Sequence, residues 1–105
     1  MSPKDAEAYT NRAEDYTKLG KMANAIADYS RIIQIYPDES DTFLARGELY
    51  AKLKKYDQAS QDYTKAIDIL PDAQLYKERA AAYKILGKMD LAIKDQRAGA
   101  ALGNK

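Results

Sequence analysis

The sequence predicts an all-α fold, a right-handed α-solenoid of three helix–turn–helix repeats with six helices in a single domain. Three observations lead to this prediction. A pattern of residues recurs three times, each copy contains two segments with apolar residues three and four positions apart, and glycine or proline stands where the segments end. We place the repeats at approximately residues 6–39, 40–72 and 73–105.

The recurring pattern opens on an aromatic residue. It begins at Tyr9, returns 34 residues later at Phe43, and returns again 33 residues later at Tyr76. The one-residue difference falls in the connection after Pro37 or Pro71, where a change of length costs little. Inside each copy the spacing is constant, as the packing of one helix on another requires. A fixed period of this kind is typical of stacked small units.

The first repeat illustrates how each pair of helices is delimited. Tyr9, Ala13 and Tyr16 lie on one face of the first predicted helix, and Gly20 then marks its end, since glycine adopts the left-handed conformation cheaply. Pro37 ends the second helix. The apolar stripe of that second helix is Met22, Ala25, Ile26, Tyr29, Ile32 and Ile33. Repeats two and three follow the same plan, with Lys54 and Gly87 at the turn.

Helix starts are marked less clearly. Ser2 followed by Pro3, with Asp5 in the first turn, is typical of a helix N-terminus. In the first connection between repeats, we expect Asp38 or Ser40 to cap the next helix. Small residues then mark where two helices approach closely. They are Ala13, Gly47 and Ala80 in the first helices, and Ala25, Ala59 and Ala92 in the second.

An arginine and an aspartate recur in every copy, always sixteen residues apart. In an antiparallel hairpin these positions lie on facing helices, so we expect structural ion pairs within each repeat, because partly buried charges are usually paired. The alternative is an arginine row that binds anions. The expected pairs are Arg12 with Asp28, Arg46 with Asp62, and Arg79 with Asp95.

These motifs resemble the tetratricopeptide repeat family, whose helix–turn–helix unit is about 34 residues long. The resemblance covers nearly the whole chain in three tandem copies. It departs from the family pattern at Arg12, Arg46 and Arg79, where leucine is usual. The third copy also has Gln96 in place of an aromatic residue and Asn104 near the expected proline. The resemblance implies a protein-interaction module, an adaptor or scaffold, rather than an enzyme.

In that family the first helices of successive repeats line a concave groove. The resemblance assigns to this groove Glu7, Thr10, Glu14, Thr17 and Lys18, then Asp41, Leu44, Glu48, Ala51 and Lys52, then Gln74, Lys77, Ala81, Lys84 and Ile85. One end is acidic and the other basic, with Leu44 and Ile85 as apolar residues among the charges. Two interpretations remain open: a solvated face of mixed charge, or a groove for a peptide or partner helix anchored at Leu44 and Ile85.

One known ligand class of the family is not expected here. Members that grip the C-terminal carboxylate of chaperone tails use lysine, arginine and asparagine side chains. The matching positions in this chain are Thr10, Glu14, Ala45, Gln74 and Glu78. None fits, and two carry the wrong charge, so we expect no binding of chaperone C-terminal tails.

Composition narrows the function further. The formal net charge is +1 over 105 residues, which argues against nucleic acid as a partner. No apolar run approaches the ~18 residues of a membrane span, and no signal peptide pattern is present, so we expect no membrane insertion and take the cytoplasm as the default compartment. Histidine and cysteine are absent. The chain therefore lacks the commonest general base, the thiol nucleophile and the ligands of most metal sites. We expect no catalysis, no cofactor and no metal.

Two local motifs that suggest ligands are set aside. Gly20-Lys21 and Gly87-Lys88 lack the other residues of a phosphate-binding loop. The acidic cluster in the first connection between repeats lacks the spacing and the glycine of a calcium loop. That cluster is Asp38, Glu39 and Asp41.

A second hypothesis concerns the end of the stack. The sequence stops after the last helix of the third repeat, so we expect no extra solvating helix. Apolar residues near this end would stay open, although Lys94, Gln96 and Arg97 make the helix more polar. The apolar residues are Tyr83, Ile85, Leu86 and Leu91. They suggest a homo-oligomeric assembly that stacks through terminal repeats, or a fragment of a longer repeat protein.

Overall fold

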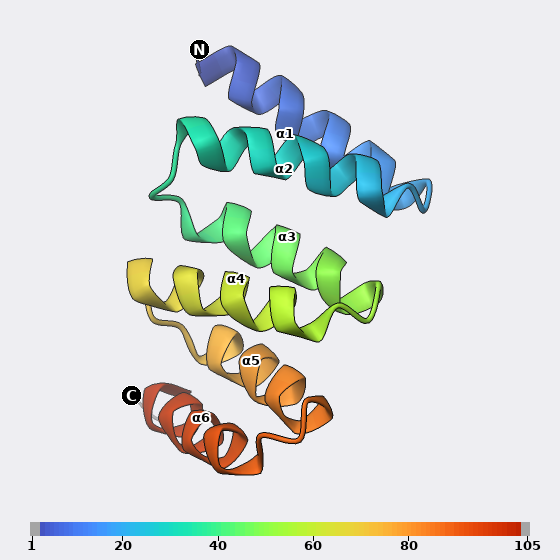
Figure 1. The fold of residues 1–105 in the computed structure, drawn as a ribbon. Helices are drawn as coiled ribbons and strands as arrows, with labels where there is room; N and C mark the ends of the chain where they lie inside the picture. Colours follow the sequence, from blue (N-terminus) through green and yellow to red (C-terminus); the bar gives the residue numbers. More distant parts are fainter. Residues whose placement is uncertain (1–2, 104–105) are drawn as a thin grey trace.

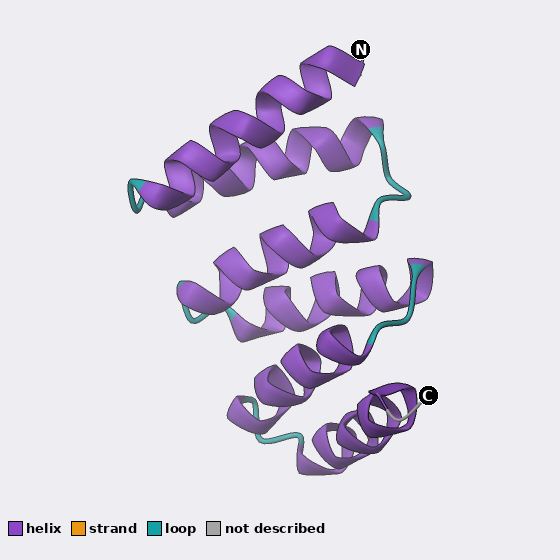
Figure 2. Cartoon of the chain, turned by 180° about the vertical axis from the view of Figure 1, so that it is seen from behind, coloured by secondary structure: helices purple, strands orange, loops and turns teal. Residues whose placement is uncertain are grey.

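The chain folds as six α-helices in three antiparallel pairs (Figure 1), as seen in a computed structural model that describes residues 3–103. The helices are α1 (Pro3–Lys18), α2 (Met22–Ile35), α3 (Ser40–Lys52), α4 (Tyr56–Ile69), α5 (Ala73–Ile85) and α6 (Met89–Gly103). Helix and loop account for all of the described chain (Figure 2). The predicted all-α solenoid is confirmed.

The helix pairs stack in chain order. Each helix packs on its partner within a pair, and α2 and α4 also pack on the first helix of the next pair, α3 and α5. The resulting body is elongated, with extents of 39 × 28 × 20 Å, and the ends of the described chain lie at opposite ends of the stack (Figure 1). The helices α1, α3 and α5 therefore form one face, here called the first-helix face. In the described residues, no helix is both long and apolar enough to cross a bilayer.

The turn inside each pair has the left-handed residue that the sequence predicted. The φ angles are 76° at Gly20, 62° at Lys54 and 79° at Gly87. In the first turn the backbone N–H of Lys21 donates to the carbonyl of Tyr16 at 2.8 Å, which closes the end of the helix. A lysine pays a conformational cost at this position that glycine does not.

Small residues lie where the helices of a pair cross. Ala13, Ala25, Ala59 and Ala92 have no exposed surface. Gly47 is even more constrained, because a Cβ atom there would lie 2.8 Å from Cε1 of Tyr63. The tyrosine ring therefore occupies the space that an alanine side chain takes elsewhere, and close approach of α3 and α4 depends on this glycine.

One of the two predicted helix starts differs from the prediction. Pro3 opens α1 and Asp5 lies in its first turn, as expected, while Ser2 and Asn104 lie outside the described residues. However, Glu39 is the N-cap of α3, with no side-chain cap bond, so the expectation that Asp38 or Ser40 caps this helix is wrong. Ser40 is already inside the helix, where its hydroxyl is badly placed to cap.

A cap that the sequence analysis missed occurs one repeat later. The carboxylate of Asp72 accepts a hydrogen bond from the backbone N–H of Gln74 at 2.8 Å and caps α5. Asp72 directly follows Pro71, and an aspartate after the proline that ends one helix could have been recognised in the sequence as the N-cap of the next helix.

Candidate functional site

An arginine and an aspartate join the two helices in every repeat. Arg46 on α3 donates from Nε to Oδ2 of Asp62 at 2.8 Å and from Nη2 to Oδ1 at 2.7 Å. Arg12 binds Asp28 in the same two-pronged way at 2.9 and 2.6 Å, and Arg79 binds Asp95 at 2.7 and 2.7 Å. The three aspartates are 2–4% exposed, so each carboxylate is held inside the stack. Bidentate pairing gives such a buried carboxylate the partner it needs.

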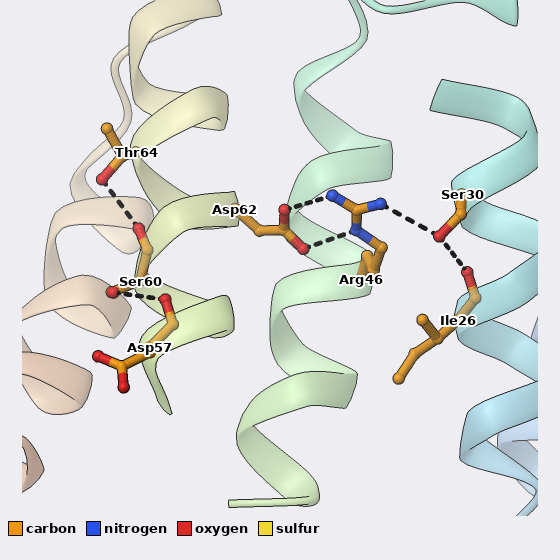
Figure 3. Close-up of polar contacts among 7 residues, drawn as sticks. All are labelled: Ile26, Ser30, Arg46, Asp57, Ser60, Asp62 and Thr64. Carbon is orange, nitrogen blue, oxygen red and sulfur yellow. Dashed lines mark hydrogen bonds and ion pairs between the residues drawn. The ribbon is translucent and has the colours of Figure 1, made fainter. Parts of the chain in front are cut away.

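Two of these arginines, Arg46 and Arg79, also reach the preceding repeat. Figure 3 shows Arg46 between Asp62 and Ser30, with Nη1 donating to Oγ of Ser30 at 3.1 Å. Arg79 repeats this contact with Oγ1 of Thr64 at 3.1 Å. Sequence reasoning missed these bonds, although the two hydroxyl residues stand 34 positions apart, at the repeat period. Each of these arginines therefore ties three helices together.

Aromatic rings flank the guanidinium groups. The Arg46 guanidinium carbon lies 5.8 Å from the ring centroids of both Phe43 and Tyr50. The pKa of Arg46 is raised, first by its hydrogen bonds to Asp62 and against the opposing effect of burial. Arg46 is therefore fully charged, and its donors face the carboxylate of Asp62 and the hydroxyl group of Ser30. This geometry supports the structural role over the binding of free anions.

Most of the residues predicted to bind a partner lie exposed on the first-helix face. The exposed ones are Glu7, Glu14 and Lys18 on α1, Asp41, Glu48 and Lys52 on α3, and Lys77, Lys84 and Ile85 on α5. Thr10 is partly buried, and its hydroxyl donates to the carbonyl of Ala6 at 2.9 Å. Thr10 is therefore less available to a ligand than its neighbours.

The two predicted apolar anchors have different surroundings. Ile85 is 59% exposed at the C-terminal end of α5. Leu44 is half-buried near the start of α3 and packs against two core clusters. It also lines a small cavity of about 130 Å³ with Leu70 and Leu75. The anchors thus lie toward opposite ends of their helices, so a ligand that touches both must run obliquely across the face.

A row of carboxyl groups crosses the first-helix face and alternates with two buried tyrosines. Burial raises the pKa of Tyr29, as do the carboxyl groups of Glu14 and Glu48. Burial likewise raises the pKa of Tyr63, together with the carboxyl groups of Glu78 and Glu48. The three glutamates belong to α1, α3 and α5, so the acidic row spans all three repeats.

Glu78 is the least solvated member of this row. Its Oε2 atom is buried and has no hydrogen-bond partner, while Oε1 accepts from Nε2 of Gln74 at 3.4 Å. Burial, then the neighbouring carboxyl group of Glu48, raise the pKa of Glu78 to about 7. Two full negative charges at Glu48 and Glu78 are therefore disfavoured, and Glu78 takes up a proton as the pH falls through about 7. Sequence reasoning considered Glu78 only as a misfit for a carboxylate-binding position.

A cavity of about 590 Å³ lies beside α4, and residues of α3 and α5 also line it. It is an open groove bounded mostly by polar side chains of α4, with Lys88 in the turn before α6 and Leu91 of α6. Charges of both signs line it, including Asp57, Lys65 and Asp68. Such a wide polar groove, without convergent groups, resembles solvated surface more than a built site.

Comparison with known proteins identifies relatives of this architecture. The sequence profile described as Tetratricopeptide repeat matches residues 4–72. A stretch of 36 residues, 34% of this chain, is 50% identical to the Hsp70-Hsp90 organizing protein 1 of Glycine max. The chain spans only 6% of the length of that relative.

Solved structures extend the likeness to the whole fold. The second TPR of Spaghetti (RPAP3), bound to the HSP90 peptide SRMEEVD, is 28% identical with a TM-score of 0.86, and the match covers 93% of this chain and 92% of that one. A crystal structure of MamA is 25% identical with a TM-score of 0.90, and the match covers 94% of this chain and 58% of MamA. At least one chain of similar fold therefore holds a short peptide.

Proposed function

The chain belongs to the tetratricopeptide repeat family, and from this premise we propose that it is an adaptor that binds a peptide or partner helix on its first-helix face without catalysing a reaction. The observation that carries the proposal is the acidic row of Glu14, Glu48 and Glu78, which crosses all three repeats. A continuous row of like charge favours a ligand with basic side chains.

The chemistry of the row differs from that of a carboxylate clamp. The HSP90 peptide held by the Spaghetti domain, SRMEEVD, is rich in carboxylates at its C-terminal end. In this chain two of the positions that match a carboxylate clamp are Glu14 and Glu78. Like charges brought together in a groove oppose binding. We therefore propose that the ligand is basic rather than acidic.

Two peptides of equal length test this proposal by isothermal titration calorimetry. One is SRMEEVD with its free carboxylate, and the other replaces its acidic residues with lysine and ends in an amide. We expect measurable affinity for the basic peptide only. Sub-millimolar affinity for SRMEEVD would overturn the proposal.

Variants then locate the contact. At pH 8, where Glu78 is mostly ionised, a Glu48→Gln/Glu78→Gln protein should lose about tenfold or more in affinity for the basic peptide, because two carboxylates that face it are neutralised. The matched control is Asp57→Asn/Asp68→Asn, which makes the same change of net charge on exposed residues of α4. Equal losses in both proteins would show only non-specific attraction by net charge.

Leu44→Glu/Ile85→Glu tests the apolar anchors in the same assay. Retained helicity by circular dichroism is required, because Leu44 also packs against the core. If the ligand uses Ile85 as an anchor, Ile85→Glu alone should lower the affinity. If the ligand lies only along the acidic row, Ile85→Glu alone should leave the affinity unchanged. A partner that binds both proteins equally would place function on another face.

A further inference from the structure

The outer face of α6 is the place where the pattern of the stack changes. On α2 and α4, the helix surface turned toward the next repeat carries a hydroxyl group, Ser30 or Thr64, which accepts a hydrogen bond from the arginine of that repeat. The equivalent position of α6, 33 residues after Thr64, is Arg97. Arg97 therefore places a positive charge at the position where Ser30 and Thr64 accept a hydrogen bond from an arginine.

The apolar part of this surface changes too. Tyr29 and Tyr63 are buried beneath the following first helix, at 8% and 3% exposure, whereas their equivalent Gln96 is exposed. The larger residues Ile32 and Ile33 of α2 correspond to Gly99 and Ala100. A cavity of about 370 Å³ lies here, bounded by Gln96, Gly99 and Ala100 of α6 and by the start of α5. Bulky side chains from a partner would fill it.

Exposed apolar residues continue the same surface. Ile93 is 42% exposed and Met89 49% exposed, although their α2 equivalents Ile26 and Met22 pack against the core. We call Met89, Ile93, Gln96, Arg97 and Ala100 the terminal face. The opposite end of the stack is different, because the matching outward positions of α1 are Ala8, Asn11 and Asp15. Compared with these α1 positions, the terminal face carries larger apolar side chains.

The charges around the terminal face are unbalanced. Within the described chain Arg97 and Lys77 are exposed and make no ion pair, and Lys77 borders the cavity. The nearby carboxylate of Asp95 is already bound by both donors of Arg79. Asp90, next to Met89, is also exposed, but Lys77, Lys94 and Arg97 outnumber it. The net charge around this surface is therefore positive, which favours a partner with carboxylates.

A second copy of the chain, stacked in register, does not match this charge. Its α1 would occupy the place of the next first helix, and its Arg12 would fall opposite Arg97, as Arg46 falls opposite Ser30. Two arginines would then meet where one arginine and one hydroxyl meet elsewhere. In-register stacking is thus opposed by like charge.

We infer that the terminal face binds a helix of a partner protein that presents a carboxylate to Arg97 and bulky apolar side chains to the cavity beside Gln96. This surface borders the first-helix face at Lys77, while the terminal-face residues themselves belong to α6. An adaptor of this shape would thus hold two partners of opposite charge preference on adjoining surfaces. Apolar contact supplies the area, and the carboxylate selects the partner.

The chain itself supplies a matched probe, because α5 is the helix that docks on α4 at the equivalent surface. Two stapled helical peptides of residues 73–86 are compared, one unaltered and one with Arg79→Glu. On the intact protein we expect the Arg79→Glu peptide to bind at least about tenfold more tightly by fluorescence anisotropy, because it replaces a like-charge contact with an opposite-charge one.

The same two peptides are then measured against an Arg97→Thr protein. It restores the hydroxyl group found at Thr64, so the preference should vanish or shift to the unaltered peptide. Equal binding of both peptides to the unmodified protein, an unchanged preference with Arg97→Thr, or no binding of either peptide at millimolar concentration would each overturn the inference. Loss of the amide NMR signals of Met89 and Ile93 on binding, with those of α1 unmoved, gives the location.

Sedimentation of the unmodified protein tests whether a second copy of the chain occupies the terminal face. We expect a monomer at the concentrations of the peptide assay. A dimer that dissociates when Ile93 is changed to serine would assign the terminal face to a second copy and overturn the inference.

Discussion

The first and second repeats contain the same arginine–aspartate pair in different surroundings. The side chain of Arg12 is 54% exposed, whereas that of Arg46 is 20% exposed, and only Arg46 also donates to a hydroxyl group of the preceding repeat. Both carboxylates, of Asp28 and Asp62, are almost completely buried. The same motif therefore has different surroundings at different positions in the stack, and we predict that the second pair stabilises the fold more than the first.

The largest expected effect comes from removing the arginine of each pair and comparing the loss of stability. Arg46→Ala should lower the free energy of unfolding by about 3–5 kcal/mol, because it leaves the Asp62 carboxylate buried without a cation. Arg12→Ala should cost less, since water can reach the space that an exposed arginine leaves. Urea denaturation of both variants measures the difference. Equal losses would show that burial of the arginine is irrelevant.

A paired replacement serves as the control for this experiment. Arg46→Met/Asp62→Leu removes both charges and keeps apolar volume, so it should be less destabilising than Arg46→Ala. If the double variant is instead the less stable of the two, the ion pair contributes more than the relief of an unpaired charge.

A second test sharpens the contrast through pH. The pKa of Glu78 in the folded protein, about 7, exceeds its ordinary value of 4.5. The stabilisation from the bound proton is therefore fully present below pH ~4.5 and is lost as the pH rises through ~7. Glu78→Gln keeps a neutral side chain, so at pH 8 it should be more stable than the unmodified protein, on the order of 1 kcal/mol once exposure of the pair is allowed for.

Thermal unfolding between pH 4.5 and 8 checks this expectation. The two proteins should be most alike at the acid end of the range and diverge as the pH rises. Glu7→Gln, a change at an exposed carboxylate of α1, is the control and should follow the unmodified protein throughout. A constant offset between Glu78→Gln and the unmodified protein would contradict the assignment of the proton to Glu78.

The smallest effect compares the turns. Lys54 adopts a φ of 62°, where the other two repeats have Gly20 and Gly87. A left-handed conformation costs a lysine ~1–2 kcal/mol, and glycine loses ~0.5–1 kcal/mol more backbone entropy on folding. Lys54→Gly should therefore stabilise the protein by roughly 0.5 kcal/mol, measured by urea denaturation. Gly20→Lys is the reciprocal variant and should destabilise the first turn.

Much of the fold follows from the sequence because the repeat itself carries the information. Tyr9, Phe43 and Tyr76 fix the period, and Gly20 and Gly87 fix the turns, since few residues tolerate that backbone conformation. A separation of sixteen residues places an arginine and an aspartate on facing helices whatever the rest of the chain does. Contacts inside one hairpin are thus largely set by local spacing.

Contacts between repeats are harder to predict. The bonds from Arg46 to Ser30 and from Arg79 to Thr64 depend on the rotation of one pair against the next, which the period leaves undetermined. The same applies to Glu78, whose burial against Glu48 arises only when α5 docks. The start of α3 was misjudged for a local reason, because Asp38, Glu39 and Ser40 are all adjacent polar residues.

The contacts from arginine to hydroxyl group give the coupling between neighbouring repeats a direction. Arg46 and Arg79 each donate a hydrogen bond to the repeat on their N-terminal side. In both bonds the preceding repeat supplies only the hydroxyl oxygen that accepts. Detaching a repeat from the C-terminal side frees a small hydroxyl group that water solvates easily. Detaching one from the N-terminal side exposes part of a guanidinium group that still anchors its own hairpin. Opening of the stack is therefore chemically asymmetric, although its units look alike.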